Sequence, residues 1–313
     1  MALYLITGIG GFIGSSLARA LLAREEQVRG VDNFATGRRE NLAEILDRID
    51  FREADILDLD AMKKACAVAD YVLHQAAIPS VPKSVLDPLG SNRANVDGTV
   101  NLLVAARDAK VKRVVYAASS SAYGDTPTLP KHEGMTPNPI SPYAVAKLAS
   151  EHYMTSFYRC YGLETVSLRY FNIFGPRQDP SSPYSGVLAK FITQMLLGEQ
   201  PTMFGDGEQS RDFTYIDNAV EANLLACTAP AAQAAGEMCN VATGRRVTLN
   251  ETFRALQKLT GYSGEPKYGP ERGGDIKHSL ADISKAEARL GYKPKVGFEE
   301  GLEKTVAWYS RAQ

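Results

Sequence analysis

Short apolar runs alternate with longer amphipathic segments through the first half of the chain. The runs typical of buried strands lie at 3–7, 27–31, 50–53, 71–75, 113–118 and 165–170. Apolar residues at helical spacing fill the intervals, most clearly at 92–109 and 143–161. This alternation predicts an α/β fold in which helices cover both faces of a doubly wound parallel sheet. Ligands of such sheets bind beyond the carboxyl ends of the strands.

The pattern changes after residue 172. Residues 175–183 are rich in glycine, proline and serine, which predicts a loop. Helical spacing of apolar residues returns at 186–197, 250–259 and 283–290. We therefore expect two domains, a sheet domain over residues 1–172 and a smaller C-terminal α/β domain over residues 173–313.

Composition and charge exclude several classes of partner. Of the 313 residues, 44% are hydrophobic and 23% are charged, and the formal net charge is −1. A chain without excess basic charge has no nucleic-acid footprint and no polybasic membrane surface, so we expect neither partner. No apolar stretch approaches the roughly 18 residues of a membrane span, and the N-terminus lacks a signal-peptide pattern, so we expect a cytoplasmic protein.

Residue types that bind metals are few and scattered. The four cysteines, Cys66, Cys160, Cys227 and Cys239, show no CxxC spacing and are best interpreted as structural thiols in a reducing compartment. The four histidines form no HxxxH pattern and no group with the cysteines. We therefore expect no metal site.

A glycine-rich turn follows the first apolar run directly. The segment Thr7-Gly8-Ile9-Gly10-Gly11-Phe12-Ile13-Gly14 leads into a predicted helix at 15–23. Gly8, Gly11 and Gly14 allow a tight turn, close backbone approach to a pyrophosphate and close packing of the helix. The N-terminus of that helix offers free N–H groups and a partial positive charge to phosphates. The order of strand, turn and helix therefore predicts a dinucleotide site.

Asp32 ends the second predicted strand and indicates which dinucleotide binds. It follows Gly14 at close to the spacing of about 20 residues expected for the acid that binds the adenosine ribose. A carboxylate there accepts a hydrogen bond from the 2′-hydroxyl and repels a 2′-phosphate, which favours NAD over NADP. Arg38 and Arg39 follow closely, and we interpret them as solvated surface arginines.

Tyr143 and Lys147 are candidates for acid–base chemistry. Their spacing of four places both side chains on one face of a helix. The ordinary pKa of tyrosine is about 10, but a nearby lysine cation and a positively charged nicotinamide both favour the phenolate. The pair can then remove a proton from a hydroxyl while a hydride leaves the same carbon. Two ordinary helix residues are the alternative, and the dinucleotide turn favours the catalytic interpretation.

These motifs together resemble a known family over essentially the whole chain. The chain resembles an extended short-chain dehydrogenase/reductase, specifically a nucleotide-sugar epimerase of the UDP-galactose 4-epimerase type. Within that type it is most similar to the bacterial branch that interconverts UDP-N-acetylglucosamine and UDP-N-acetylgalactosamine. The motifs that carry the resemblance are Thr7-Gly8-x-x-Gly11-x-x-Gly14, Asp55-Ile56, His74-Gln75-Ala76-Ala77, Asn95, Ser119-Ser120-Ser121-Ala122-Tyr123-Gly124, Ser141-Pro142-Tyr143-x-x-x-Lys147, Arg169-Tyr170-Phe171-Asn172, Gly205-Asp206-Gly207, Arg211-Asp212-Phe213 and Arg272-Gly273-Gly274-Asp275.

The resemblance implies a Rossmann-type NAD-binding domain, with residues 212–242 partly returning to it, and a smaller domain that binds a UDP-sugar. It also implies that NAD stays bound, because each turnover regenerates it. The implied cofactor contacts are Gly8, Gly11, Phe12, Ile13, Gly14, Asp32, Asn33, Asp55, Ile56, Gln75, Ala76, Ala77, Asn95, Ser119, Tyr143, Lys147 and Tyr170.

The resemblance implies C4 epimerisation through a 4-keto sugar. Tyr143 removes the C4 hydroxyl proton as hydride passes to NAD⁺, Lys147 lowers the pKa of the tyrosine and holds the nicotinamide ribose, and Ser119 binds the C4 oxygen or relays its proton. Whether Ser119 or Tyr143 takes the first proton stays open. The implied substrate contacts are Ser120, Ser121, Tyr143, Asn172, Val187, Phe204, Arg211, Arg272, Asp275 and Ser279.

Several of the implied contacts have an alternative interpretation. Arg211 and Arg272 match the arginines that bind the diphosphate in the family, but surface salt bridges are the alternative for each. Phe204 packs either on the uracil or in the core. The serines of 119–121 also suit a turn that satisfies backbone groups at a strand end. His74 matches no catalytic role and is expected to be a hydrogen-bonded core residue.

Two positions bear on the reaction and the sugar. Related dehydratases carry Thr-Asp-Glu where this chain has serines, and related decarboxylases carry a glutamate; hydroxyls cannot supply that acid–base pair at neutral pH, so C4 epimerisation fits best. Ser279 stands where the resemblance places a wall of the sugar pocket. A tyrosine there restricts the family to UDP-glucose and UDP-galactose, whereas serine permits, without demanding, an N-acetyl group.

Two other functions stay open. A UDP-glucuronate 4-epimerase or decarboxylase needs a partner for the sugar carboxylate, and the sequence identifies none. A catalytically silent NAD-binding regulator typically lacks the tyrosine or the lysine, and both are present here. The resemblance further implies a homodimer formed by a four-helix bundle of the helices at 92–109 and 143–161, with candidate contacts Leu102, Leu103, Tyr153, Phe157 and Tyr161.

Overall fold

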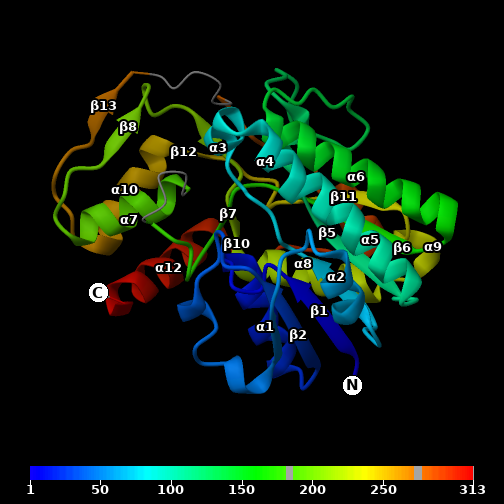
Figure 1. Cartoon of the computed structure of the whole chain (residues 1–313). Helices are drawn as coiled ribbons and strands as arrows, with labels where there is room; N and C mark the ends of the chain where they lie inside the picture. Colours follow the sequence, from blue (N-terminus) through cyan, green and yellow to red (C-terminus); the bar gives the residue numbers. More distant parts are fainter. Residues whose placement is uncertain (181–185, 271–276, 313) are drawn as a thin grey trace.

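A seven-stranded parallel sheet forms the centre of the computed structural model, which describes residues 1–180, 186–270 and 277–312 (Figure 1). The strand order is β11-β6-β5-β4-β1-β2-β3. The strands are β1 (Leu3–Thr7), β2 (Gln27–Asp32), β3 (Asp50–Glu53), β4 (Tyr71–His74), β5 (Arg113–Ser119), β6 (Glu164–Tyr170) and β11 (Glu237–Val241). The α/β doubly wound fold expected from the alternating pattern is confirmed.

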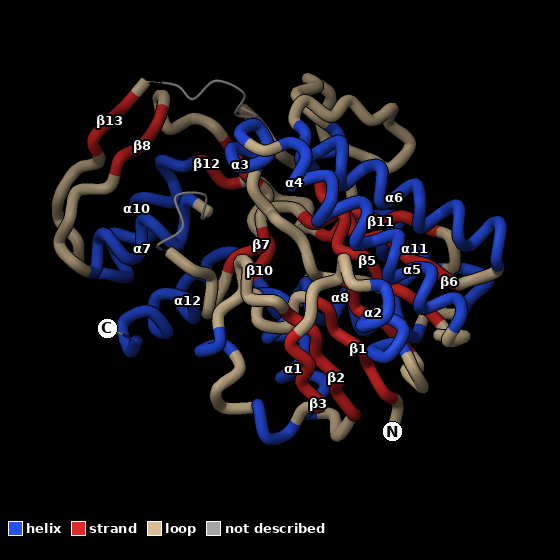
Figure 2. The backbone as a smooth tube through the Cα atoms, in the orientation of Figure 1, coloured by secondary structure: helices blue, strands red, loops and turns tan. Residues whose placement is uncertain are grey.

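Helices cover both faces of this sheet (Figure 2). One face carries α1 (Phe12–Ala23) and α8 (Ile216–Thr228), and the other carries α2 (Leu59–Cys66), α5 (Gly98–Asp108) and α6 (Pro142–Tyr161). The neighbours Leu5 and Ile6 of β1 are fully buried in two different hydrophobic clusters, one for each face. Burial on both faces explains why the strands are continuous apolar runs.

The helix expected at 92–109 is interrupted. It consists of α4 (Pro88–Asn92), a π-helical turn (Arg93–Asp97) and α5, and the short α3 (Val81–Leu86) precedes them. The carbonyl oxygen of Asn95 accepts hydrogen bonds from the hydroxyls of Thr99 and Ser150, which stabilises the widened turn.

A second lobe lies at the left of Figure 1. The helices of this lobe, α7 (Val187–Leu196), α10 (Leu249–Thr260) and α12 (Phe298–Ala312), pack on one another. Two small sheets accompany them, β8 (Thr202–Phe204) with β13 (Lys267–Gly269) and β9 (Ser210–Arg211) with β12 (Val247–Thr248). A third pair, β7 (Ile173–Phe174) with β10 (Thr214–Tyr215), lies near α8 and α12, and α9 (Ala231–Ala234) and α11 (Ser284–Leu290) lie near β6 and β11. The division into domains at residue 172 stays a prediction.

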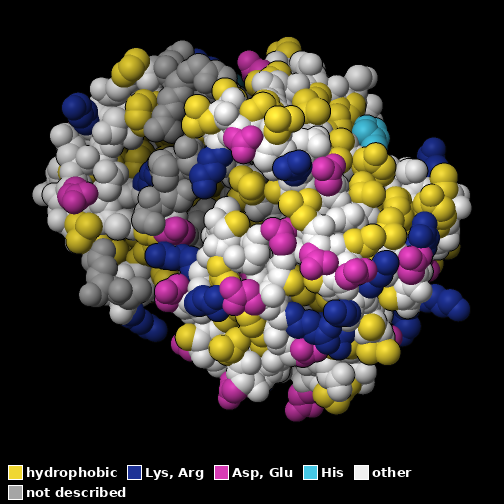
Figure 3. Space-filling view, in the orientation of Figure 1, with side chains coloured by type: hydrophobic (Ala, Val, Ile, Leu, Met, Phe, Trp, Pro, Cys, Tyr) yellow, Lys and Arg dark blue, Asp and Glu magenta, His cyan; other side chains and the backbone are white. Residues whose placement is uncertain are grey.

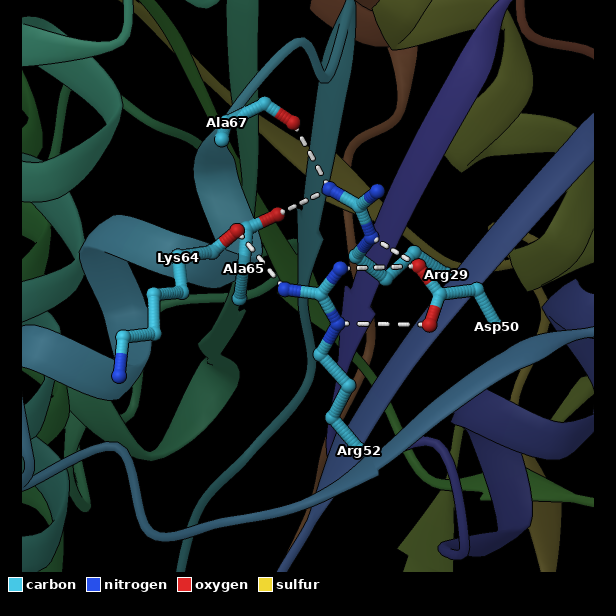
Figure 4. A network of polar contacts seen from close by, with 6 residues as sticks. All are labelled: Arg29, Asp50, Arg52, Lys64, Ala65 and Ala67. Carbon is cyan, nitrogen blue, oxygen red and sulfur yellow. Dashed lines mark hydrogen bonds and ion pairs between the residues drawn. The ribbon is translucent and has the colours of Figure 1, made fainter.

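Two arginines fix the C-terminal end of α2 against the sheet (Figure 4). Arg29 of β2 donates to the carbonyl oxygens of Ala65 and Ala67 at 2.9 and 2.8 Å, and its Nε is 2.6 Å from a carboxylate oxygen of Asp50. Arg52 of β3 shares that carboxylate. Carbonyl groups at the end of a helix have no partner within the helix, so this network supplies one and holds the β2–β3 edge in place.

The expected dimer contacts need one correction. Leu102 and Leu103 are fully buried inside the monomer, and Phe157 is 6% exposed, so these three side chains cannot form a contact between subunits. They belong to the hydrophobic cluster between α5, α6 and the sheet. Tyr153 and Tyr161 of α6 are exposed. None of the helices within the described ranges has the length and apolar character needed to cross a membrane.

Candidate active site

The glycine-rich turn lies between β1 and α1, against the end of β4. Gly8 has a φ of +70°, and a Cβ atom there would lie 2.7 Å from the Cα atom of Ala76. A Cβ atom on Gly14 would lie 2.2 Å from the carbonyl oxygen of Gly8. Only glycine fits at both positions, so the turn presents bare backbone next to the start of α1 at Phe12. A dinucleotide pyrophosphate is bound by a turn of this kind.

Asp32 ends β2 beside this turn. Its carboxylate accepts hydrogen bonds from the backbone N–H groups of Gly10 at 2.8 Å and Phe34 at 2.7 Å. Burial raises the pKa of Asp32, and these hydrogen bonds oppose the rise. The backbone thus holds the carboxylate beside the glycine turn, and its contact with the adenosine ribose stays a prediction.

The two arginines that follow Asp32 are paired with acids. Arg38 lies 3.1 Å from Asp179, and Arg39 lies 2.7 Å from Glu53. Both side chains are about half exposed, at 49% and 62%. They are the surface arginines that the sequence indicated, and their pairing fits a site for NAD rather than NADP.

Other predicted cofactor residues lie in the loops after β2 and β3. The side-chain amide of Asn33 donates to Asp55 at 2.8 Å, and the second oxygen of Asp55 accepts from the N–H of Leu57, also at 2.8 Å. Ile56, the residue after Asp55, is buried. The structure therefore brings Asn33, Asp55 and Ile56 together beyond the strand ends, on the same edge as Asp32.

A second group of predicted cofactor residues lies beyond β4. The Tyr170 hydroxyl lies 3.3 Å from the Gln75 side-chain oxygen, and the Asn223 amide donates to that hydroxyl at 2.7 Å. Burial raises the pKa of Tyr170 to about 12. Asn95 binds the N–H of Ile78 at 2.9 Å and so fixes the loop that carries Ala76 and Ala77. Asn223, on α8, was not predicted, because its position among helix residues gives no sign of this contact.

Tyr143 and Lys147 lie in the first two turns of α6. Ser141 caps that helix, and the backbone N–H of Tyr143 is 3.0 Å from the Ser84 hydroxyl. Burial raises the pKa of Tyr143, and a hydrogen bond with Ser119 opposes the rise. The buried Lys147 ammonium donates to the carbonyl oxygen of Ala117 at 2.8 Å, and burial lowers its pKa to about 7. The lowering of the tyrosine pKa by Lys147 stays a prediction.

A serine turn continues from β5 into this site. Ser119 ends the strand and caps a 3₁₀ turn (Ser120–Tyr123). Its hydroxyl oxygen accepts from the N–H of Ser121 at 3.2 Å and from the Ser121 hydroxyl at 2.8 Å. Ser119 thus both satisfies the turn and reaches Tyr143, whereas its contact with the C4 oxygen of a sugar stays a prediction.

A cleft of about 230 Å³ opens beside the second lobe, and it brings together Asn172, Val187, Phe204 and Arg211 from the predicted substrate contacts. Its other walls include Gln178, Phe191, Gln209 and Phe213. Asn172 has a φ of +39°, and its side chain donates to the carbonyl oxygen of Asp212 at 3.1 Å. The Arg211 guanidinium donates to the carbonyl oxygens of Ser210 and Lys277, both at 3.0 Å.

Three further predicted contacts lie near residue 275. Arg272 and Asp275 fall outside the described residues. Ser279 is half buried, and its N–H donates to the carbonyl oxygen of Ser210 at 3.0 Å, so its segment runs beside the strand that carries Arg211. Ser279 is not among the residues that line the cleft.

Asp212 is a buried residue next to Arg211 that the sequence marked only as part of a motif. It is fully buried, and its carboxylate accepts from the N–H and hydroxyl of Thr243 and from the N–H groups of Gly244 and Ala281. Burial raises the pKa of Asp212, and these bonds oppose the rise. The carboxylate thereby fixes the position of the neighbouring Arg211 relative to residues 243–244 and to Ala281. Across the described ranges, no group of three or more His, Cys, Asp or Glu side chains is placed to hold a metal ion.

Residues 4–242 match the model of the NAD dependent epimerase/dehydratase family. The chain belongs to this family. NAD is therefore its cofactor, and the bare cradle formed by Gly8, Gly14 and Ala76, with Asp32 beside it, fits that dinucleotide.

Relatives within the family carry related activities. The UDP-glucose 4-epimerase of Mycolicibacterium smegmatis is 40% identical over 309 residues, which cover 97% of each chain. The UDP-glucuronate 4-epimerase of Thermodesulfobacterium geofontis is 33% identical, over 98% of this chain and 96% of that one.

Solved structures agree with the fold over its whole length. The UDP-glucose 4-epimerase of Thermotoga maritima, solved with UDP-glucose, has a TM-score of 0.94 and 40% identity, covering 99% of each chain. The UDP-N-acetylglucosamine 4-epimerase of Methanobrevibacter ruminantium M1, solved with UDP-N-acetylmuramic acid, has a TM-score of 0.93 and 41% identity, covering 100% of this chain and 99% of that one. The chain is thus a member of the nucleotide-sugar 4-epimerases.

Proposed function

We propose that the chain interconverts UDP-N-acetylglucosamine with UDP-N-acetylgalactosamine, and UDP-glucose with UDP-galactose, through a transient 4-keto sugar. The grouping of Tyr143, Lys147 and Ser119 at the carboxyl end of β5 carries this proposal. The glycine turn lies at the same edge of the sheet. The cleft around Arg211 supplies a place and a charge for the diphosphate.

In this mechanism each side chain has a defined task. Tyr143 takes the proton of the C4 hydroxyl, and Ser119 binds the C4 oxygen or passes that proton on. The bound cofactor supplies the acceptor and later the donor of the C4 hydride. Lys147 holds the nicotinamide ribose, and its charge favours the phenolate. Loss of the hydroxyl proton and the C4 hydride leaves a ketone; return of the hydride to the opposite face of C4, with return of the proton to the C4 oxygen, gives the epimer.

The choice of sugar rests on Ser279. A small side chain permits a 2-N-acetyl group beside the diphosphate, and the segment of Ser279 runs along the strand of Arg211. The names of the two structural neighbours support both the acetylated and the neutral sugars. The glucuronate relative favours a second candidate, UDP-glucuronate 4-epimerisation, which needs a cationic or polar partner for the C5 carboxylate.

We also propose a homodimer. Val85, Leu86 and Leu89 of α3 and α4 are 62%, 81% and 77% exposed, and Tyr153 and Tyr161 of α6 are exposed as well. Figure 3 shows hydrophobic side chains gathered where Figure 1 draws α3, α4 and α6. Exposed apolar side chains grouped in this way favour association. Light scattering should give twice the 34.0 kDa of one chain, and Leu86→Glu with Leu89→Glu should give the monomer. A wild-type particle of one chain's mass at micromolar concentration would refute the dimer.

Substrate conversion without added NAD tests the function. The purified protein is incubated separately with UDP-N-acetylglucosamine, UDP-glucose and UDP-glucuronate, and the products are resolved by anion-exchange chromatography. Formation of UDP-N-acetylgalactosamine and UDP-galactose, lost in Tyr143→Phe, is the expected result. Conversion of UDP-glucuronate alone would replace the proposal by the second candidate. Failure with all three sugars, even with NAD supplied, would overturn the enzymatic assignment to these sugars.

A further inference from the structure

His74 is a buried titratable residue that the proposed chemistry does not use. It ends β4 and is only 1% exposed. Its Nδ1 lies 2.7 Å from the hydroxyl oxygen of Thr7, and its Nε2 lies 2.9 Å from the hydroxyl oxygen of Thr99. Both ring nitrogens are thus engaged by hydroxyls, each of which can donate or accept.

The surrounding contacts determine the direction of these hydrogen bonds. The Thr99 oxygen lies 2.6 Å from the carbonyl oxygen of Asn95, which can only accept, so the Thr99 hydroxyl donates its proton there. The Thr99 oxygen must then accept from the His74 Nε2–H. A neutral imidazole carries one N–H, so Nδ1 accepts from the Thr7 hydroxyl. The three hydrogen bonds therefore run in one direction, from Thr7 to His74, from His74 to Thr99 and from Thr99 to Asn95.

Burial and charge both favour the neutral ring. Burial, with a smaller contribution from the charge of Lys147, lowers the pKa of His74 to about 3. A protonated His74 would donate from both nitrogens and place a second positive charge near the catalytic lysine. The neutral ring places no second positive charge near Lys147.

This chain of hydrogen bonds joins two parts of the active site. Thr7 is the last residue of β1, next to Gly8, and its oxygen lies 3.4 Å from the N–H of Ala76. The carbonyl oxygen of Asn95 lies in the π-helical turn and also accepts from the Ser150 hydroxyl at 2.7 Å. Ser150 is on α6, one turn after the catalytic lysine.

We propose that His74 is a positioning residue, held as the neutral Nε2–H tautomer, which ties the glycine turn to the Asn95 turn and so sets the distance between the cofactor cradle and α6. The cofactor part of this inference rests on the family, and only its effect on turnover rests on the proposed function. Loss of these hydrogen bonds should weaken NAD binding and displace Lys147. It should leave the cleft that binds the nucleotide unchanged.

Matched variants of Thr99 separate this role from general packing. Thr99→Val keeps the shape of the buried side chain but removes the acceptor for His74 and the donor to Asn95, whereas Thr99→Ser keeps the hydroxyl. We expect Thr99→Val to weaken NAD⁺ binding about tenfold, or about 1.4 kcal/mol. It should lower kcat by a similar factor and leave KM for the UDP-sugar unchanged. Thr99→Ser should restore most of both values.

The tautomer is measured directly on the wild-type protein by ¹⁵N–¹H NMR of labelled histidines. The signals of His74 are those lost in His74→Gln, or, if that variant does not fold, those retained when His132, His152 and His278 are all replaced by glutamine. The expected spectrum shows an Nε2–H tautomer that stays neutral from pH 8 to pH 5. An Nδ1–H tautomer, or an imidazolium at pH 6, would overturn the proposal.

NAD binding gives a result even if no sugar is converted. The affinity is measured from the fluorescence of bound NADH. This measurement therefore still tests the role of His74 if the proposed function is wrong. If the affinities of Thr99→Val for NADH and NAD⁺ lie within twofold of those of the wild type, the hydrogen bonds of His74 do not position the cofactor cradle. An equal loss in Thr99→Val and Thr99→Ser would assign the effect to packing and equally overturn the proposal.

Discussion

The ammonium group of Lys147 lies 2.8 Å from the carbonyl oxygen of Ala117, and this hydrogen bond joins α6 to the strand that ends in Ser119. The same ammonium group lies 4.7 Å from the centre of the Tyr116 ring. Because Ala117 and Ser119 belong to one strand, the register between α6 and β5 also sets the distance from Tyr143 to Ser119. The tyrosine, the lysine and the serine are therefore positioned as one unit.

Replacing Lys147 should change how stability depends on pH. Burial lowers its folded-state pKa from 10.5 to about 7, so the unfolded chain binds more protons between these values and the stability of the wild type should rise with pH across that window. Lys147→Met carries no such proton and should lack the rise. Urea unfolding of cofactor-free protein at pH 7, 8.5 and 10 measures the difference, with the exposed Lys64→Met as the control. Parallel curves for wild type and Lys147→Met would contradict the burial of a lysine that loses its proton.

Removing the Ser119 hydroxyl should raise the pKa of Tyr143 further, because the hydrogen bond from that serine opposes the rise caused by burial. The phenolate then forms at higher pH, so the rising limb of the kcat–pH profile should move to higher pH in Ser119→Ala. We also expect kcat near neutral pH to fall about tenfold or more. Ser156→Ala, at an exposed position of α6 outside the site, is the control. An unshifted profile in Ser119→Ala would remove the serine from the proton path.

Asp212→Asn should destabilise the fold and weaken substrate binding together. The amide replaces one of the two acceptor oxygens with a donor, which faces either Thr243 or the N–H groups of Gly244 and Ala281. Buried donors left without an acceptor cost about 1–3 kcal/mol each, so we expect a loss of roughly 2–4 kcal/mol. KM should rise because Arg211 is displaced. Denaturant unfolding and initial rates measure both, with the exposed Asp206→Asn, expected to cost less than about 0.5 kcal/mol, as the control. Unchanged stability would refute this role for Asp212.

Ser279→Tyr should restrict the sugar. A bulky ring beside the strand of Arg211 should reduce kcat/KM for UDP-N-acetylglucosamine by roughly 100-fold, whereas kcat/KM for UDP-glucose should change by only a few-fold. Ser279→Ala controls for loss of the hydroxyl and should leave both values near those of the wild type. If Ser279→Tyr converts the N-acetyl sugar as fast as before, residue 279 does not form the wall of the sugar pocket.

The sequence could predict the parts of the site that short-range rules determine. The glycine turn follows from one strand and one helix, and Tyr143 with Lys147 follows from the spacing of one helix. The parallel sheet follows from the alternation of elements. Each of these depends on neighbours within about one turn or one strand, where periodicity carries the information.

Contacts between distant segments could not be predicted in the same way. Asp212 meets Thr243 and Ala281, and His74 meets Thr7 and Thr99, only once the chain has folded. Leu102, which was expected at a subunit interface but is buried inside the monomer, shows another limit of prediction from sequence. Helical spacing identifies an apolar face but does not say whether it covers the same monomer's sheet or a second subunit.

In the proposed reaction, a hydride leaves C4 of the sugar and returns to the same carbon, and Tyr143 and Ser119 transfer the proton. Epimerisation of UDP-glucose or UDP-N-acetylglucosamine carrying deuterium at C4 tests this most directly, with the product analysed by mass spectrometry and NMR. We predict that the epimer retains its deuterium at C4 in ordinary water, and that Tyr143→Phe forms epimer at least about 100-fold more slowly. Loss of the deuterium to solvent during epimerisation would contradict it.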